Sequence, residues 1–361
     1  MIFSSKATPR WPATLARLVC TRVALWVGIA SLGLVASCGG GTSQFDPFIP
    51  KRLLVFGDDY SALTQNNRNY SVNAIDVNGN INCIGQPIWV QQLASVYGFS
   101  FAECNPNADF QPAGRMLAFA GAKVADVGAQ VEAQVAAGGF RDKDLATVLA
   151  GANDIIELYE SYPSLSQDIL LAEARARGQR LARVVNRLVD LGAKVIIADL
   201  PDLGLSPYAV SRRTVGQTFD PVDFISRLTV AFNEQLGVNV VLDGRFVGLV
   251  QTQLRFQAIA RSPGSFGLLN ITAGICTVAP PNCTSSTLLP DATVNTYLWS
   301  DDRRLAPGGH AQLASLAVDR ARRNPLAALC ASGFPPRAAV GQAPYSPRSK
   351  KRTVVLFGAA G

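Results

Sequence analysis

The sequence predicts an α/β fold in which a parallel sheet lies between two layers of helices. Short, continuous apolar runs, typical of strands buried on both faces, alternate with longer segments of helical periodicity. The predicted strands are residues 53–56, 145–150, 194–200 and 246–250. Strands that alternate with helices favour right-handed βαβ crossovers, and therefore a three-layer α/β/α sandwich with a parallel sheet. Ligands of such sheets bind at the carboxyl ends of the strands.

The predicted helices follow these strands in the chain. They are residues 87–97, 124–137, 167–191, 223–235 and 311–323. The clearest is the third, which is rich in Ala, Leu and Arg and is followed by Gly192 as a stop signal. Pro307 suits the first turn of the last helix, where a missing N–H is tolerated. The polar, Asn-rich residues 64–84 are expected to form a surface loop.

The N-terminus is predicted to be a lipoprotein signal peptide, residues 1–37. Basic residues precede an apolar run, residues 23–36, which is too short to span a bilayer comfortably. The run ends in Val35-Ala36-Ser37-Cys38, which resembles a bacterial lipobox. That resemblance implies that Cys38 is lipidated and becomes the first residue of the mature protein. The alternative is an ordinary signal peptide followed by a chance cysteine.

Three further segments are expected after the signal peptide. Residues 38–50 begin with a glycine-rich stretch and should be a flexible tether. Residues 51–330 should form one folded domain, and the Pro- and Arg-rich residues 331–361 a disordered tail. No aspartate follows Cys38, which by analogy with bacterial lipoproteins fits export to the outer membrane, on its periplasmic face or at the cell surface. The lipid on Cys38 would then be the contact with the membrane.

Composition limits the possible functions. Of 361 residues, 48% are hydrophobic and 16% are charged, which predicts a folded domain with a large core. The formal charge of +7 comes largely from basic residues near both ends, and no basic stripe interleaved with aromatics lies between them. We therefore do not expect nucleic-acid binding. The single histidine and the lack of any Cys-x-x-Cys pair argue against a metal site, and no cofactor is expected.

Export would place the cysteines in an oxidising compartment, where disulfides form. Cys276 and Cys283 flank a proline-rich turn, and Cys83 and Cys104 bracket an irregular stretch, so these four are the expected disulfide cysteines. The sequence leaves their pairing open, together with the role of Cys330.

Four short blocks carry the strongest functional signal. Residues 53–61 read as a buried strand that enters a Gly57-Asp58-Asp59 turn, and Gly121 follows a second apolar segment. The run Gly151-Ala152-Asn153-Asp154 follows a third, and residues 299–310 read as a loop that enters the last helix. In this order the blocks resemble those of the GDSL, or SGNH, family of esterases and lipases. The resemblance covers about residues 53–323 and implies a flavodoxin-like sandwich.

The resemblance also assigns site residues. Asp59 stands at the position of the family's serine nucleophile, and Arg304 at the position of its histidine base. Asp301 stands where the orienting carboxylate is found, three residues before the base position. The resemblance assigns Gly121 and Asn153 to the oxyanion hole, which stabilises the tetrahedral intermediate of acyl transfer.

The two replacements predict a protein that is degenerate at its catalytic centre and serves a binding or structural role. A guanidinium stays protonated and cannot accept a proton, while a carboxylate at position 59 would occupy the oxyanion donors. If the fold brings them together, Asp59 and Arg304 should form an ion pair, with Asp301 as a second partner of Arg304. The centre could also bind an acyl ester or an anionic ligand. The alternative is an active carboxylic-ester hydrolase that uses His310, or another group, as its base.

Overall fold

A five-stranded parallel sheet organises the part of the chain that the structure, a computed structural model, describes: residues 48–216 and 219–322. Its strand order is β4-β1-β5-β6-β7. The strands are β1 (Arg52–Gly57), β4 (Gly114–Met116), β5 (Asp144–Leu149), β6 (Lys194–Ala198) and β7 (Val247–Val250). All four neighbouring pairs are parallel, as the sequence predicts.

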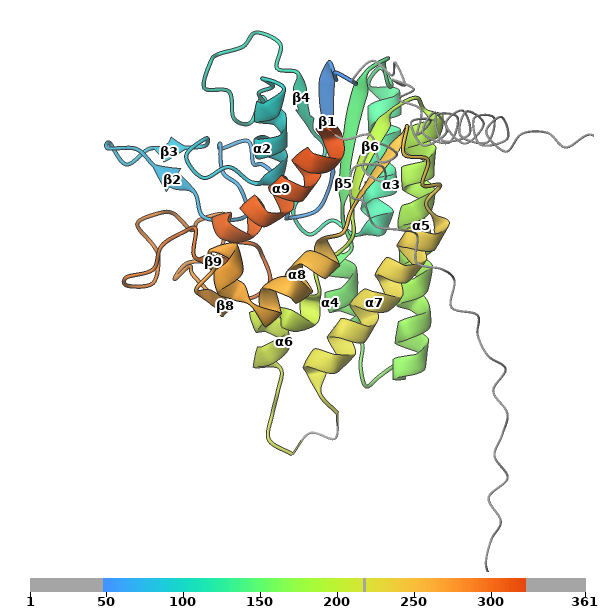
Figure 1. The fold of residues 1–361 in the computed structure, drawn as a ribbon, viewed down its shortest axis with the longest axis vertical. Helices are drawn as coiled ribbons and strands as arrows, with labels where there is room; N and C mark the ends of the chain where they lie inside the picture. Colours follow the sequence, from blue (N-terminus) through green and yellow to red (C-terminus); the bar gives the residue numbers. More distant parts are fainter. Residues whose placement is uncertain (1–47, 217–218, 323–361) are drawn as a thin grey trace, which may run out of the picture. The chain divides into compact units, whose positions relative to one another are not determined.

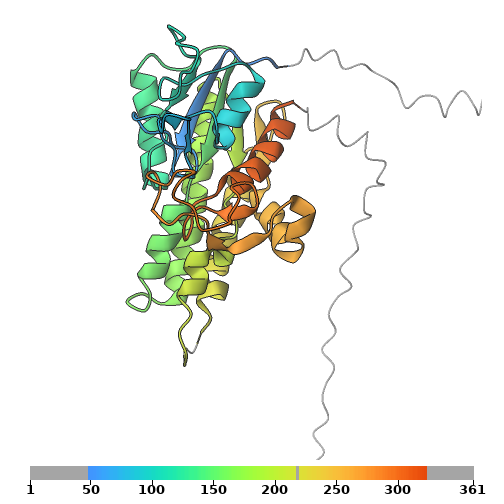
Figure 2. The same ribbon diagram turned by 90° about the vertical axis from the view of Figure 1, so that its left-hand side faces the viewer.

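Helices cover both faces of this sheet (Figures 1 and 2). On one side α3 packs against α5 and β1, α5 also packs against β6, and α7 lies along α5. On the other side α2 packs against α9, which contacts β6 and β7. Their bounds are α2 (Trp89–Val96), α3 (Val124–Ala136), α5 (Gln167–Asp190), α7 (Pro221–Asn239) and α9 (Pro307–Arg322). The predicted three-layer α/β/α sandwich is confirmed.

The core is built from the apolar runs that predict the strands. Leu53, Leu54, Val55 and Phe56 of β1 are fully buried, and each such side chain contributes roughly 1.5–3 kcal/mol relative to an exposed one. On α5, Gly178 allows α7 to approach closely, because a Cβ atom there would lie 2.2 Å from the backbone oxygen of Phe232. The apolar runs thus form the buried strands, and Gly178 permits the close contact between α5 and α7.

Several shorter elements are absent from the sequence prediction. They are β2 (Ala74–Ile75), β3 (Ile81–Asn82), the sheet strand β4, α4 (Ala152–Glu160), η1 (Leu203–Leu205), α6 (Pro207–Ser211), α8 (Thr252–Arg261), η2 (Pro263–Phe266), β8 (Asn270–Gly274) and β9 (Tyr297–Trp299). The expected loop of residues 64–84 contains the small antiparallel pair β2–β3. The helix α4 begins directly after Gly151, so that Asn153 lies in its first turn instead of in a loop.

Two disulfides join Cys83 to Cys104 and Cys276 to Cys283, which confirms the four predicted disulfide cysteines and resolves their pairing. Disulfides are typical of proteins that fold outside the reducing cytoplasm. Within residues 48–322, apart from the gap at 217–218, no helix is long and apolar enough to cross a bilayer. The predicted signal peptide, Cys38, most of the tether, Cys330 and the tail lie outside the described residues.

Candidate active site

The turn after β1 brings Asp59 to the carboxyl end of the sheet. Gly57 ends the strand with φ +141°, and a Cβ atom there would lie 2.1 Å from the backbone oxygen of Leu149 on β5. Only glycine fits this conformation and this close approach. The side chain of Asp59 is then 8% exposed, so it is placed in a largely dry environment.

The two predicted oxyanion donors both point at Asp59. The backbone N–H of Gly121 donates to Asp59 Oδ2 at 2.7 Å, and Asn153 Nδ2 donates to the same oxygen at 3.0 Å. Gly121 has φ +78°, a conformation that favours glycine, and Asn153 is oriented further by donating to the backbone oxygen of Ala122 at 3.0 Å. One carboxylate oxygen of the chain itself therefore holds both donors.

Arg304 holds the other carboxylate oxygen of Asp59. Its Nε donates to Asp59 Oδ1 at 2.8 Å, and its Nη2 lies 2.8 Å from the same atom. The predicted ion pair is therefore present. Arg304 Nη1 donates to Asp301 Oδ2 at 2.6 Å, so that Asp301 is the predicted second partner of the guanidinium. The Tyr70 ring lies against this cation, 5.8 Å from the guanidinium carbon to the ring centroid.

Asp301 organises the loop that carries Arg304. Its Oδ1 accepts the backbone N–H groups of Arg303 and Arg304, at 3.0 and 2.6 Å. Tyr60, next to Asp59, donates its hydroxyl to the backbone oxygen of Arg303 at 2.6 Å. The turn after β1 and the loop before α9 are thus joined by a hydrogen bond in addition to the ion pair.

The electrostatics of the centre follow from these contacts. Burial alone would raise the pKa of Asp59, but the Arg304 charge and the hydrogen bonds from Asn153, Gly121 and Arg304 outweigh burial and lower it. Burial likewise opposes the charge of Arg304, yet Asp59 and Asp301 raise its pKa above the usual value. Both groups are therefore ionised at neutral pH, and Arg304 cannot act as a base.

Asp58, the neighbour of Asp59, has the opposite electrostatics. It is fully buried, its Oδ1 accepts the backbone N–H of Tyr60 at 3.1 Å, and its Oδ2 has no hydrogen-bond partner in the described part of the chain. Burial and the negative charge of Asp59 raise the pKa of Asp58 well above its usual range. The sequence places Asp58 in the turn but does not predict its burial, because a buried aspartate in a turn looks the same as an exposed one in sequence.

A network of ion pairs next to Asn153 fixes the start of α4. Asp154, the next residue of α4, accepts the backbone N–H of Val124 at 3.0 Å and lies 3.2 Å from Arg177 Nη1 of α5. Arg177 also pairs with Glu157, which pairs with Lys123. The start of α4 is thereby tied to α3 and α5. Sequence reasoning missed this network because Arg177 lies 23 residues from Asp154.

His310 lies in a different environment. It is 1% exposed at the start of α9, and its Nδ1 accepts the backbone N–H of Trp89 at 3.4 Å. Burial lowers the pKa of His310 to about 3. The Trp89 indole donates to Ser61 Oγ at 3.1 Å, so Ser61 and His310 contact the same tryptophan at two different groups. Within the described residues, neither forms a hydrogen bond with Asp59, Gly121 or Asn153.

The two donors predicted for an oxyanion hole are both occupied by the chain itself. A carboxylate occupies Gly121 N–H and Asn153 Nδ2, and an arginine neutralises that carboxylate. In the described residues no group of three or more His, Cys, Asp or Glu side chains could hold a metal ion.

Comparison with known proteins gives similar structures at low identity. No family profile and no curated protein matches the sequence. The acetyl xylan esterase AlAXEase is 12% identical over 73% of this chain and 96% of that chain, with a TM-score of 0.40. A G-D-S-L family lipolytic protein from Veillonella parvula DSM 2008 is 12% identical over 74% of this chain and 96% of that chain, with a TM-score of 0.40. A catalytic mutant of the acetylxylan esterase Axe2 from Geobacillus stearothermophilus is 16% identical over 75% of this chain and 94% of that chain, also with a TM-score of 0.40. Likeness at this level says nothing about activity.

Proposed function

We propose that the protein is an exported, lipid-anchored relative of the SGNH/GDSL hydrolases that has lost ester hydrolysis and serves a structural or binding role. The observation that carries the proposal is the position of Asp59 Oδ2, which accepts both from Gly121 N–H and from Asn153 Nδ2. An oxyanion would need these same donors. The chain therefore supplies its own permanent ligand to the site.

The chemistry of ester hydrolysis supports this reading. A nucleophilic hydroxyl needs a base within hydrogen-bond reach, and that base must be able to give up its proton again. Asp59 is ionised but is engaged by Arg304, whose guanidinium cannot exchange a proton at neutral pH. Loss of the nucleophile and base as a unit lowers turnover by about 10⁶ in a well-studied hydrolase.

A structural role for the former centre is favoured over ligand binding. The guanidinium of Arg304 already has two carboxylate partners, Asp59 and Asp301, so an external anion would have to displace one of them. The ion pair joins the turn after β1 to the loop before α9, two segments separated by 245 residues. Binding of an acyl ester or an anionic ligand stays the second role that this centre could serve.

The rival, an active esterase with His310 as its base, has no contact that favours it. His310 is almost fully buried, and its Nδ1 faces a backbone N–H. A base must reach the proton that it removes, directly or through one water molecule.

The catalytic part of the proposal is tested by an ester-hydrolysis assay. The purified full chain and an Asp59→Ala variant are compared on p-nitrophenyl acetate and butyrate. We expect the two rates to be equal to each other and to the rate of a heat-denatured sample. Turnover by the unaltered chain that is abolished by Asp59→Ala or by His310→Asn contradicts the proposal.

The anchor is a separate part of the proposal, because Cys38 lies outside the described residues. Cells that express the chain are labelled with a radioactive fatty acid, and label on the protein is measured by gel electrophoresis. We expect labelling that a Cys38→Ser variant loses, while a Cys330→Ser variant keeps it. Equal labelling of the unaltered chain and Cys38→Ser contradicts lipidation at this position.

A further inference from the structure

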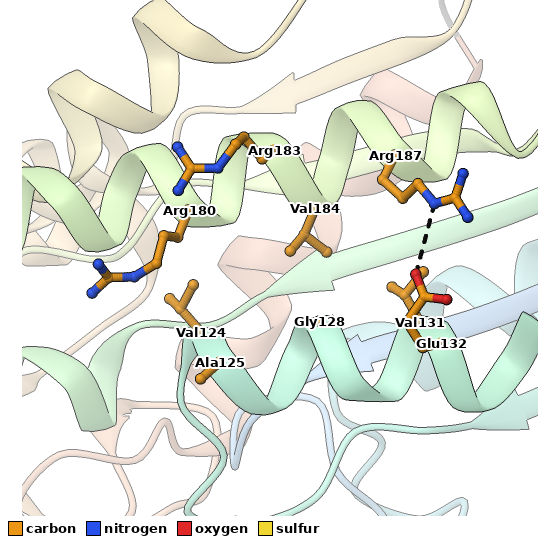
Figure 3. Close-up of a pocket in the computed structure, with 9 residues that line it drawn as sticks. All are labelled: Val124, Ala125, Gly128, Val131, Glu132, Arg180, Arg183, Val184 and Arg187. Atoms are coloured by element: carbon orange, nitrogen blue, oxygen red, sulfur yellow. Dashed lines mark ion pairs between the residues drawn. The ribbon is translucent and has the colours of Figure 1, made fainter.

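A groove of about 340 Å³ lies between α3 and α5 and shares no lining residue with the Asp59–Arg304 centre. Figure 3 shows the arginines of α5 along one wall and the small and apolar residues of α3 along the other. Val124 and Val131 of α3 are buried, and Val184 of α5 points toward α3 between them. The floor of the groove is therefore apolar.

Gly128 keeps the groove open at its middle. Glycine inside a helix is destabilising relative to alanine, so a glycine at position 128 calls for a structural explanation. At Gly178 of α5 the reason is close packing, since a Cβ atom there would lie 2.2 Å from a backbone oxygen. At Gly128 the nearest atom to such a Cβ is Val184 Cγ2 at 3.9 Å, which is ordinary contact. No close packing therefore explains Gly128, and any larger side chain there would enter the groove.

The rim of the groove is cationic. Arg180, Arg183 and Arg187 lie on one face of α5, because residues three and four apart are neighbours on a helix. The single acidic lining residue, Glu132, is 3.7 Å from Arg187 and mostly exposed. Arg180 pairs with Glu173 outside the groove, and Arg183 has no hydrogen bond or ion pair with any residue that the structure describes. The groove thus carries excess positive charge above an apolar floor.

We propose that this groove binds a medium-chain fatty acid, with the acyl chain on the valines and the carboxylate at the arginines. Arginine is suited to a carboxylate because its planar fork can donate two parallel hydrogen bonds. The volume is at the lower end of the range for small-ligand sites, roughly 300–1,000 Å³, which fits one acyl chain better than two. The proposal is independent of whether the Asp59–Arg304 centre is active.

The test is photolabelling of the full chain with a dodecanoic acid that carries a diazirine in its acyl chain, followed by peptide mapping. We expect label on peptides from α3 and α5, competed by unlabelled dodecanoic acid. Gly128→Leu fills the groove and should lower this labelling by roughly tenfold or more, which corresponds to about 1.4 kcal/mol of binding free energy. The matched control is Gly237→Leu in α7, where a Cβ atom has no neighbour within 4 Å.

The charge is tested separately at an exposed position that does not endanger folding. Arg183→Glu should lower labelling by the fatty acid probe roughly tenfold, and the same diazirine probe with an amine head group should label the unaltered chain poorly. Three outcomes would overturn the proposal: equal labelling by both probes, labelling that Gly128→Leu and Arg183→Glu leave unchanged, or labelling that appears only after deletion of residues 336–361. The last would assign the groove to the chain's own C-terminal segment.

Discussion

Two polar clusters beside the sheet hold the residue types of a hydrolase in very different states. In the first, Asp59 and Arg304 are both charged and form an ion pair, and the predicted oxyanion donors Gly121 and Asn153 also bind Asp59. In the second, Ser61 and His310 are neutral, buried, and hydrogen-bonded to Trp89. The hydroxyl and the imidazole are thus in one cluster, and the predicted oxyanion donors are in the other. Catalysis needs all of them at one place, so possession of a serine and a histidine is not sufficient.

The largest effect should come from breaking the charged cluster. Removal of one partner of a buried ion pair lowers the free energy of unfolding by about 3–5 kcal/mol, because the other charge stays buried. Arg304→Ala leaves Asp59 and Asp301 facing each other without a cation, so we expect a loss in this range by urea denaturation.

The control for that measurement is Arg245→Ala. Arg245 pairs with Asp243 at 2.6 Å, but its side chain is 62% exposed, and exposed pairs contribute about 0–1 kcal/mol. Equal losses for the two variants would mean that the Asp59–Arg304 cluster is no more important for stability than a surface pair.

The neutral cluster of Ser61 and His310 should make the free energy of unfolding depend on pH. The pKa of His310 is about 3 in the folded chain, against 6.5 for an ordinary histidine, so the unfolded chain takes up the proton first as pH falls. The stability that neutral His310 contributes is full above pH 6.5 and is lost progressively toward pH 3. At pH 5 the expected loss is about 2 kcal/mol, from 1.36 kcal/mol per pKa unit.

The His310→Asn variant isolates this term, because Asp58 and Asp59 titrate in both proteins. Between pH 7 and pH 5 the unaltered chain should lose about 2 kcal/mol more than the variant, measured as free energy of unfolding in urea. Identical pH profiles would show that His310 is accessible to protons in the folded state, and would remove the contrast between the two clusters.

A smaller effect on stability should appear when the Asp59 carboxylate is removed and acetate is supplied in its place. Asp59→Ala removes the carboxylate that accepts from Gly121 N–H, Asn153 Nδ2 and Arg304 Nε, and acetate offers these donors the same group. Acetate at ten times its dissociation constant would stabilise the variant by about 1.4 kcal/mol. We expect acetate, but not acetamide, to raise the melting temperature of Asp59→Ala, and neither to change the unaltered chain. Equal shifts in both proteins would mean that acetate binds elsewhere.

Much of the fold could be predicted from the sequence because buried parallel strands are continuous apolar runs. Residues 53–56 and 145–150 correspond to β1 and β5 within a residue or two. The helix α4 could not be predicted, since it begins directly after Gly151, whose φ of +123° lies inside a motif that looks like a turn. The blocks that resemble those of the SGNH family, together with charge, predicted the Asp59–Arg304 pair. The raised pKa of Asp58 and the contacts of Arg177 depend on burial and on partners distant in sequence, which no local pattern encodes.

The most direct test of the self-occupied centre is a double-mutant cycle with Asp59→Ala, Arg304→Ala and the double variant, each measured as free energy of unfolding. Residues in direct contact show interaction energies of about 0.5–3 kcal/mol, and a buried pair with three further hydrogen-bond partners should be in the upper half of that range. We predict that Asp59 and Arg304 stabilise each other by about 1.5–3 kcal/mol. An interaction energy indistinguishable from zero would contradict the ion pair that fills the oxyanion site.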